Sequence, residues 1–503
     1  MRRAWIHVAA LIVLLSAIAA LNHEQPLVRN GLVYARAAWN VIDAGYDPRP
    51  VVADSHRSYD KPIGFAWLAA PLVARLGAHD GLRLVSLVGT IAYALAACFL
   101  ARALAPKRED GSGAWWVAWL ATLGPLATYQ AWSAHPDSWF AALFVVAVAL
   151  THRLATGDER AVPRRALLLL ATLLAAFLLK NYALILLPSC ALYLGLHFGW
   201  RRRAGQSVGR RLLWCGAALG LFGAFVAAAR FGVNPLSRLE GEGGGADQYA
   251  LASFGSIWWK TLAQLALALG LQFHFAGLAV LAALTGLAGS TISRRAWRER
   301  DLVLPWLCFG AIYVAGLLPF PTAFYNMRYF LPLFPLLAIA VVRGAETVPA
   351  RARTIGLISF LALNATTTLL FNWAPLFDAV RPHLPDTKVN WLEGGPPLSL
   401  LDNLRMEQHR DQAEWLRTID QNAEPGATVY MVDVVYYRDA QQQVFERDGF
   451  LRRDLAIHYV RRRELQPNES HFFVWSFLPT PPDLTPFGRV TDLGNRVFRV
   501  DPR

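Results

Sequence analysis

Residues 84–105 read LVSLVGTIAYALAACFLARALA, and residues 166–179 read ALLLLATLLAAFLL. Because a helix of about 20 apolar residues crosses the roughly 30 Å of hydrocarbon in a bilayer, blocks of this kind indicate membrane spans. The composition agrees, since 55% of the 503 residues are hydrophobic and only 17% are charged, against about a quarter in soluble domains. These numbers exclude intrinsic disorder, a fibrous repeat and a disulfide scaffold. The sequence therefore predicts a polytopic α-helical membrane protein.

About eleven spans are expected along the chain. They are residues 4–21, 84–105, 114–132, 138–155, 165–180, 182–200, 212–229, 272–292, 302–320, 329–344 and 354–372. The first is expected to be a retained helix, because no small-residue cleavage site follows it. Two further apolar stretches, 63–77 and 257–271, are expected to lie in the membrane interface. For residues 257–292 the pattern also permits two spans.

The net charge of +13 is an orientation signal. Basic clusters fall on alternate connections between the expected spans: Arg2/Arg3, Lys107/Arg108, Arg160/Arg164/Arg165, Arg201–Arg203 with Arg210/Arg211, Arg294–Arg300, and Arg343–Arg353. Lys and Arg accumulate on cytoplasmic loops, so the N-terminus is expected in the cytoplasm and the C-terminus outside. This distribution accounts for the positive charge without nucleic acid as a partner.

Two domains are expected from the distribution of apolar residues. A transmembrane domain covers residues 1–372 and includes a first outer loop at 22–83 and a Gly-rich mobile outer loop at 230–256. Residues 373–503 are expected outside the membrane. Residues 405–421 have helical spacing, and Pro425–Gly426 is followed by the strand-like run ATVYMVD. Further short strands are expected at 470–476, 487–491 and 496–500, which together predict a small extracytoplasmic α/β domain.

The first outer loop is expected to carry interfacial helices. Apolar residues at Leu32, Val33, Ala37 and Val41 have helical spacing and predict an amphipathic helix that ends at Gly45. The second interfacial helix is the stretch at 63–77.

Charged residues on the outward side are the candidates for chemistry. Lys61, Lys180 and Arg328 are cations on the side where cations are scarce. A long side chain that reaches the interface explains each of them separately, and helix capping explains Asp137 at the start of the fourth span. Together with Asp60, however, they place cations and carboxylates at one membrane face. Cations at that depth suit a lipid-linked phosphate, and carboxylates suit the activation of a hydroxyl group.

This set of residues resembles the GT-C superfamily of polyprenyl-phosphate-sugar-dependent glycosyltransferases, closest to the branch of the lipid A aminoarabinose transferases and protein O-mannosyltransferases. That branch begins its first outer loop with Asp-Glu and Tyr-Ala, followed by a Gly and an acidic-Lys-Pro motif. The matching positions here are Asn30, Gly31, Tyr34, Ala35, Gly45, Asp60, Lys61 and Pro62. The family's second-loop Asp, its Lys after the fifth span and its late Arg-Tyr match Asp137, Lys180 and Arg328–Tyr329. The resemblance extends from the first helix to about residue 345.

One position departs from the family pattern. Asn30 stands where the family has the Asp that is its usual candidate for the catalytic base, and a neutral amide cannot accept a proton. Asp137 and Asp60 are then the first alternatives for the base, and Glu24 and Asp54 the next. Otherwise the acceptor is activated differently, or transfer activity has been lost.

The resemblance implies a glycosyltransferase that moves a sugar from a polyprenyl-phosphate donor to an acceptor hydroxyl, with inversion at the anomeric carbon. Lys61, Lys180 and Arg328 would bind the donor phosphate, and Asp137 is favoured as the base. The sugar or acceptor would contact Tyr34, His135, Tyr182, Tyr329, Arg238 and Tyr249, the last two from the mobile loop. No cofactor is required, and a divalent metal on Asp60 with His135 or His56 is not favoured.

The expected partners are the lipid-linked donor, a glycan, glycolipid or protein acceptor, and the bilayer, which is expected to be a bacterial inner membrane. A non-catalytic binder or flippase of lipid-linked sugars is one alternative, because it needs the same phosphate-binding cations without a base. A transporter is the other. It would place charges near the membrane midplane and use broken helices, whereas the cations here lie at one face.

Overall fold

The computed structural model of the chain describes most of its residues. They are residues 2–27, 30–46, 64–104, 112–230, 254–274, 304–317, 324–345, 349–383, 388–389, 398–399, 407–432, 447–448, 454–460, 462–467, 471–476 and 482–501. The chain divides into two compact units. The helical unit comprises Met1–Leu21, Asp60–Phe65 and Ser86–Arg405, and the mixed unit comprises Asn22–Tyr59, Ala66–Val85 and Met406–Arg503. The predicted division at residue 372 separates membrane from non-membrane residues, whereas the compact units group the first outer loop with the C-terminal residues.

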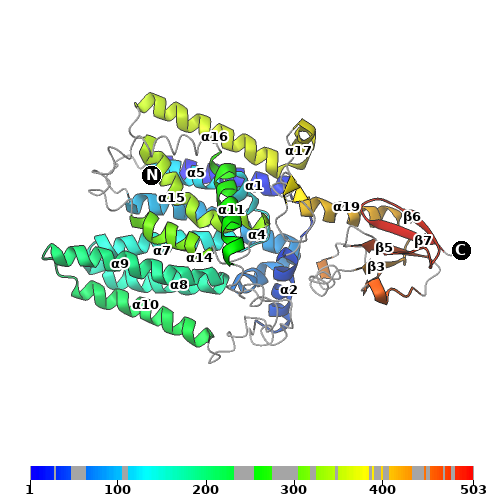
Figure 1. Cartoon of the computed structure of the whole chain (residues 1–503), viewed down its shortest axis with the longest axis horizontal. Helices are drawn as coiled ribbons and strands as arrows, with labels where there is room; N and C mark the ends of the chain where they lie inside the picture. The colour runs from blue at the N-terminus through cyan, green and yellow to red at the C-terminus, as the bar shows by residue number, and fades with distance from the viewer. Residues whose placement is uncertain are drawn as a thin grey trace. The chain divides into compact units, whose positions relative to one another are not determined.

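Packed helices build the helical unit (Figure 1). They are α1 (Arg2–Leu21), the later part of α4 (Gly64–Leu104), α5 (Ser112–Thr122), α6 (Pro125–Tyr129), α7 (Asp137–Thr156), α8 (Val162–Leu179), α9 (Leu186–Arg203), α10 (Gly209–Arg230), α11 (Phe254–Phe273), α14 (Ile312–Leu317), α15 (Phe334–Ala345), α16 (Ala350–Asn372) and α17 (Ala374–Val380). Tighter or wider turns flank several of them: η1 (Glu159–Ala161), η2 (Asn181–Ile185), η6 (Trp306–Ala311), η7 (Phe324–Leu333) and η8 (Arg381–His383). α7 packs against α8, α9 and η7.

The chain is a multi-pass membrane protein. Six of the described helices are long and apolar enough to cross a membrane: Gly64–Leu104, Asp137–Thr156, Glu159–Leu179, Asn181–Arg203, Gly209–Ala228 and Ala350–Asn372. Shorter apolar helices cover Trp5–Leu21, Gln264–Phe273 and Trp306–Leu317. The predicted count of eleven spans is not confirmed by these helices. The expected span at 272–292 lies outside the described residues from residue 275 onward.

The expected span at 114–132 is interrupted in the structure. α5 ends at a Gly-Pro pair and the short α6 follows, because proline has no N–H to continue the helix ladder. The carbonyls left at the break are bonded by buried amide side chains of other helices. Gln272 Nε2 donates to the Leu120 carbonyl at 3.2 Å, and Asn364 Nδ2 donates to the Leu123 carbonyl at 2.7 Å. These hydrogen bonds satisfy backbone carbonyls that would find no hydrogen-bond donor in the apolar core of a membrane.

α11 includes the stretch that the sequence predicts as an interfacial helix, residues 257–271. In Figure 1 this helix runs crosswise to α9 and α16 of the same unit. A crosswise helix is expected where a segment lies in the interface and its neighbours cross the bilayer. The place of this helix in the interface stays a prediction.

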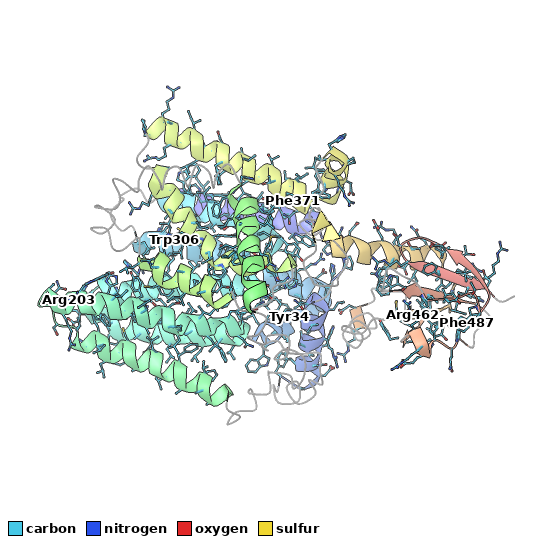
Figure 2. The ribbon with its side chains drawn as sticks, viewed as in Figure 1. Tyr34, Arg203, Trp306, Phe371, Arg462 and Phe487 are labelled. Atoms are coloured by element: carbon cyan, nitrogen blue, oxygen red, sulfur yellow. The ribbon has the colours of Figure 1, made fainter. Side chains whose placement is uncertain are left out.

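Arginines from two expected cytoplasmic connections meet at one end of the helical unit. Arg165, Arg201 and Arg211 donate to carbonyls at the last residues of α7, at distances of 3.0, 3.4 and 2.6 Å. Arg203 ends α9 (Figure 2). α7 has 20 residues and is therefore about 30 Å long. This length separates the arginines from Asp137, which begins the helix.

α4 consists of two helices joined at Gly77. This residue has φ 80° and ψ 167°, a conformation that is in practice open to glycine only. The carboxylate of Asp448 accepts a hydrogen bond from the Ala78 N–H at 2.6 Å, so it caps the helix that starts after Gly77. A separate helix that ends at residue 77 is thus confirmed, and its place in the interface stays a prediction.

The amphipathic helix of the first outer loop is α2 (Asn30–Asp43). Its apolar face buries Leu32, Val33 and Val41. Gly45 follows with φ +61°, and the Tyr46 N–H donates to the Val41 carbonyl at 2.8 Å. This is the left-handed glycine stop that the sequence predicts.

A five-stranded mixed sheet follows in the mixed unit. Its strands are β3 (Thr428–Val432), β4 (Ala456–Val460), β5 (Phe472–Ser476), β6 (Arg489–Asp492) and β7 (Val497–Asp501), in the order β4-β3-β5-β7-β6. β3 is parallel to β4 and β5, and β7 is antiparallel to β5 and β6. α19 (Glu407–Asn422) lies against the sheet, and its Trp415 stacks on Trp475 with ring centroids 4.3 Å apart.

The predicted small α/β domain is confirmed in outline. β3 and β5 are buried along their whole length, as expected for strands that have a neighbour on each side in the sheet. The residue pattern of β4 does not predict a strand, because β4 is a half-exposed edge strand without a clear apolar alternation. The two-residue strands β1 (Lys388–Val389) and β2 (Leu398–Ser399), which pair with each other, are also not predicted from the sequence.

Candidate functional site

Asp137 lies between two cations inside the helical unit. Its Oδ1 is 3.0 Å from Lys180 Nζ, and its Oδ2 is 3.2 Å from Arg328 Nε. The three side chains come from different elements, namely the first turn of α7, the junction of α8 with η2, and η7. We call Asp137, Lys180 and Arg328 the ion triad.

The ion triad is buried and carries a net positive charge. The side chains of Asp137, Lys180 and Arg328 are 3%, 10% and 5% exposed. Removing charges from water is costly, so buried charges persist where partners compensate them. Here one carboxylate lies between two cations, so the three side chains together carry one positive charge. The arrangement is suited to bind an anion.

The backbone before α7 determines the position of Asp137 in that helix. Pro136 is the N-cap of α7 and makes no side-chain capping bond, so Asp137 is the first helical residue and does not act as the cap. Asp137 therefore does not have the helix-capping role that would explain it by itself. Ala134 has φ +58°, an uncommon conformation for a residue with a Cβ. Such strained positions are often found at functional sites.

Aromatic rings line the ion triad. Lys180 Nζ lies 4.9 Å from the ring centre of Tyr329, and Arg328 Cζ lies 5.6 Å from it. The Tyr182 ring is 5.1 Å from the Tyr329 ring. Cation–π contacts of this kind help to hold cations in place. The structure thus brings together five residues that the sequence analysis names for the site.

His135 lies directly before the helix that carries Asp137. Its side chain is buried, its ring centre is 6.4 Å from that of Tyr129, and its carbonyl accepts a hydrogen bond from Ser86 Oγ at 3.3 Å. These contacts hold the turn that precedes α7. A contact of His135 with sugar or acceptor stays a prediction.

Other predicted site residues belong to the mixed unit. Asn30 begins α2, Tyr34 is buried in the same helix with 1% exposure (Figure 2), and Glu24 is exposed in the turn after α1. Their roles in catalysis or binding stay predictions. The remaining candidates lie outside the described residues: Asp60, Lys61, Arg238, Tyr249, Asp54 and His56.

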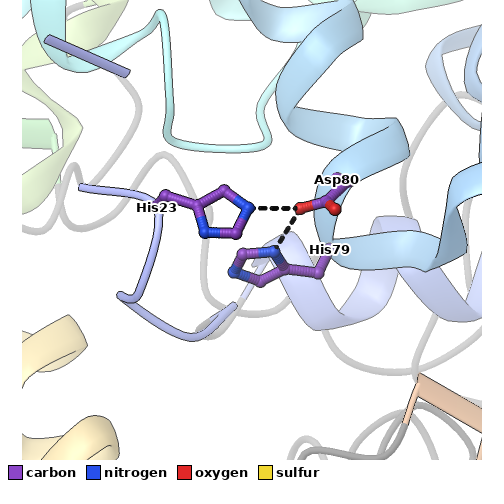
Figure 3. Close-up of side chains that lie close together, drawn as sticks. All are labelled: His23, His79 and Asp80. Atoms are coloured by element: carbon purple, nitrogen blue, oxygen red, sulfur yellow. Dashed lines mark hydrogen bonds and ion pairs between the residues drawn. The ribbon is translucent and has the colours of Figure 1, made fainter. Parts of the chain in front are cut away.

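One polar cluster was missed by the sequence analysis. His23, His79 and Asp80 place their side-chain ligand atoms within 4.8 Å of one another (Figure 3). His79 and Asp80 are adjacent, but His23 lies far from them in the sequence, so spacing gives no signal. Only the fold brings the three together.

Two crystal structures of ArnT from Cupriavidus metallidurans are similar to this chain. One is bound to undecaprenyl phosphate and has a TM-score of 0.50, and the other is in the apo state with a TM-score of 0.51. Each has 12% sequence identity and covers 99% of this chain and 98% of the ArnT chain. The likeness shows that the chain shares the overall fold of ArnT along nearly its whole length.

A crystal structure of the Archaeoglobus fulgidus oligosaccharyltransferase in complex with Zn and sulfate is a more remote match. It has a TM-score of 0.44 and 12% identity, and the match covers 89% of this chain and 62% of the oligosaccharyltransferase chain. No family model and no curated protein matches the chain.

Proposed function

We propose that the chain is a membrane glycosyltransferase that transfers a sugar from a polyprenyl-phosphate donor to a hydroxyl group of an acceptor. The observation that carries the proposal is the buried ion triad of Asp137, Lys180 and Arg328. The shared fold adds support, because ArnT with this fold is bound to undecaprenyl phosphate in one of its crystal structures.

The charge of the ion triad matches that of the proposed donor. A sugar linked to polyprenyl phosphate is a phosphodiester with one negative charge, and the triad carries one positive charge in excess. Lys180 and Arg328 would form charge-assisted hydrogen bonds with the phosphate oxygens. When the sugar leaves, a second negative charge develops on the phosphate, and the same two cations would stabilise it. Lys61 is proposed as a third phosphate ligand from its position in the sequence.

In the proposed reaction the acceptor oxygen attacks the anomeric carbon from the side opposite to the phosphate, which inverts the configuration. The bond between the anomeric carbon and the phosphate oxygen breaks, and its electron pair stays on the phosphate. The hydroxyl proton passes to a carboxylate. The products are the glycosylated acceptor and polyprenyl phosphate.

Asp137 is better suited to position the cations than to act as the base favoured from the sequence. Each of its oxygens is paired with a cation, so accepting a proton would disrupt an ion pair. We therefore assign to Asp137 the positioning of Lys180 and Arg328. The base is then proposed to be a carboxylate of the first outer loop, with Asp60 before Glu24.

The orientation of the protein in the membrane is proposed from the positions of its arginines. The arginine-rich end of α7 to α10 is proposed to face the cytoplasm, which places the ion triad at the outer face. A bacterial inner membrane is proposed, with glycans, glycolipids or proteins of the cell envelope as acceptors.

Binding of the phosphate group tests the proposed role of the cations. Purified protein in nanodiscs is titrated with polyprenyl phosphate, and uncharged polyprenol serves as the ligand control. Lys180→Met and Arg328→Met are each expected to weaken binding by about 10- to 150-fold, because a hydrogen bond to a charged group contributes about 1.5–3 kcal/mol. Arg202→Gln removes an exposed arginine from the opposite end of the helices and should bind like the wild type. Unchanged binding in both Met variants would contradict the assignment.

Transfer itself needs a second assay. Membranes that contain radiolabelled lipid-linked sugar are incubated with acceptor fractions and with wild type or variant protein. The wild type should transfer label, and Asp60→Asn should lose transfer while it still binds polyprenyl phosphate. If Asp60→Asn is active and Glu24→Gln is not, the base is Glu24. Tight binding by the wild type without transfer to any fraction would instead support the binder or flippase.

A further inference from the structure

The His23, His79 and Asp80 side chains converge in the mixed unit (Figure 3). Asp80 Oδ1 lies 3.1 Å from His23 Nε2 and 2.7 Å from His79 Nδ1. The two imidazole rings are 5.3 Å apart at their centres and nearly perpendicular. Two imidazoles and a carboxylate form a donor set that suits zinc and similar divalent transition metals.

The hydrogen bonding of His79 is typical of a metal-ligating histidine. Its Nε2 lies 3.1 Å from the Gln25 carbonyl, while its Nδ1 faces Asp80. A neutral ring has one N–H, so it can donate to only one of these two acceptors. When Nε2–H donates to the carbonyl, the Nδ1 lone pair points at the carboxylate. A cation coordinated by both Nδ1 and the carboxylate oxygen would remove this conflict, and a backbone carbonyl on the other nitrogen is the usual partner of such a ring.

Arg83 fixes the turn that presents His23. Its guanidinium donates to the carbonyls of Asn22 at 2.6 Å and His23 at 2.8 Å, and also to that of Gln25. The turn is closed by a hydrogen bond from the Gln25 N–H to the Asn22 carbonyl at 3.1 Å. His23 is therefore held near His79 and Asp80 by contacts that do not involve its own ring.

Charge and access also permit a cation. The positive charge of Arg83 would oppose metal binding. The negative charge of Asp448 offsets this effect, because the Asp448 carboxylate accepts a hydrogen bond from the N–H of Ala78, the neighbour of His79. The side chains of His23 and Asp80 are 65% and 47% exposed. A metal ion can thus reach the cluster from solvent and keep water in its remaining coordination position.

We propose that His23, His79 and Asp80 form a binding site for a divalent transition metal such as zinc. The ion would join the turn after α1 to the start of the second helix of α4, and so fix both ends of the first outer loop. Its role would be to position that loop. The inference does not depend on the proposed transfer activity, because it concerns other residues and another ligand.

Zinc binding by the full-length protein tests this site. The purified protein is stripped of metal with a chelator, and its zinc affinity is measured by competition with a fluorescent zinc chelator. The wild type is expected to bind one zinc ion per chain, and cobalt should give the absorption bands of a low-coordinate nitrogen and oxygen site. His23→Ala and Asp80→Asn are expected to lose at least ~10-fold in affinity, the loss found when even a residue that supports a ligand is removed.

His458→Gln is the matched control, because His458 is an exposed histidine of β4 in the same unit. It should bind zinc like the wild type. His23→Ala removes a largely exposed side chain, and an unchanged elution volume in size-exclusion chromatography would show that it folds. Zinc should raise the midpoint of thermal unfolding of the wild type and His458→Gln but not of His23→Ala. Absence of zinc binding by the wild type, or equal binding by His23→Ala, would overturn the proposal.

Discussion

Asp137 shows how one carboxylate can organise a buried site. It holds Lys180 and Arg328 at 3.0 and 3.2 Å from its two oxygens, and the Tyr329 ring lies against both cations. These three side chains together carry one positive charge. Removing Asp137 and removing a cation should consequently have unequal effects on stability.

Asp137→Asn is expected to lower the free energy of unfolding by about 3–5 kcal/mol, because two buried cations lose their counter-charge. Lys180→Met should cost less, since Asp137 keeps Arg328 as a partner. The double variant Asp137→Asn/Lys180→Met should be less destabilised than the sum of the two single variants. Thermal unfolding in detergent without polyprenyl phosphate measures this order, and additive effects would speak against a coupled triad.

Asp448 links a titratable group to the stability of the mixed unit. Burial raises the pKa of its carboxyl above the ordinary value, and hydrogen bonds from the Ala78 N–H and the Trp39 indole offset part of this shift. A pKa that is raised on folding means that the folded state binds the proton more tightly than the unfolded state does. The stability contributed by this group is thus present at low pH and is lost as pH rises through the folded-state pKa.

The Asp448→Asn variant should lack this pH dependence. The free energy of unfolding of the wild type minus that of the variant is expected to decrease as pH rises from about 4, near the ordinary carboxyl pKa, toward neutrality. Denaturant titrations at several pH values measure the difference. A difference that stays constant at all pH values would rule out Asp448 as the source of the pH dependence.

At the scale of elements, the break in α4 depends on one glycine. Gly77 has a backbone conformation that side chains strain, and a Cβ there would lie 2.9 Å from the Asp448 carboxylate. Residues 447 and 448 also hold α2, because Arg447 forms an ion pair of 2.7 Å with Asp43 and Trp39 donates to Asp448 at 3.1 Å. Gly77 and Asp448 therefore act together to end one helix and start the next.

Gly77→Ala is expected to destabilise the protein by about 1–3 kcal/mol, the cost of a strained backbone conformation. Gly216→Ala is the matched control, since Gly216 is helical and a Cβ there meets no atom within 4 Å. That substitution should stabilise α10 by about 0.5–1 kcal/mol. Midpoints of thermal unfolding distinguish the two, and equal effects would contradict the role of Gly77.

At the scale of the whole molecule, the distribution of arginines predicts the orientation in the membrane. Arg165, Arg201 and Arg211 bond to the last residues of α7, and Asp137 begins the same helix. Lys and Arg on one end indicate the cytoplasmic side. The opposite end, with the ion triad, is then expected at the outer face.

Cysteine labelling in spheroplasts tests this orientation. All four native cysteines are buried, so the wild type should stay unlabelled by a membrane-impermeant maleimide. Thr491→Cys, on the exposed strand β6, should be labelled in intact cells. Ser207→Cys, in the exposed connection between α9 and α10, should be labelled only after the membrane is disrupted. The reverse pattern would invert the proposed topology.

Local sequence features were sufficient to predict a large part of the fold. Apolar runs predicted the membrane class, because transfer into hydrocarbon depends on the residues of one segment. Spacing within a few residues likewise predicted α2 with its stop at Gly45, α19, and the strands β3, β5, β6 and β7. The edge strand β4 was missed because its stability comes from pairing with β3 more than from its own pattern.

The sequence predicted an outward position for Lys180 and Arg328, which stays a prediction, and the structure brings both cations to Asp137. That both cations share this one carboxylate was decided by the tertiary structure. The same is true of His23 beside Asp80, 57 residues away, and of Asp448 as the cap of a helix 370 residues earlier. Side-chain pairs of this kind depend on how distant segments pack, which neither local propensity nor hydrophobic periodicity encodes.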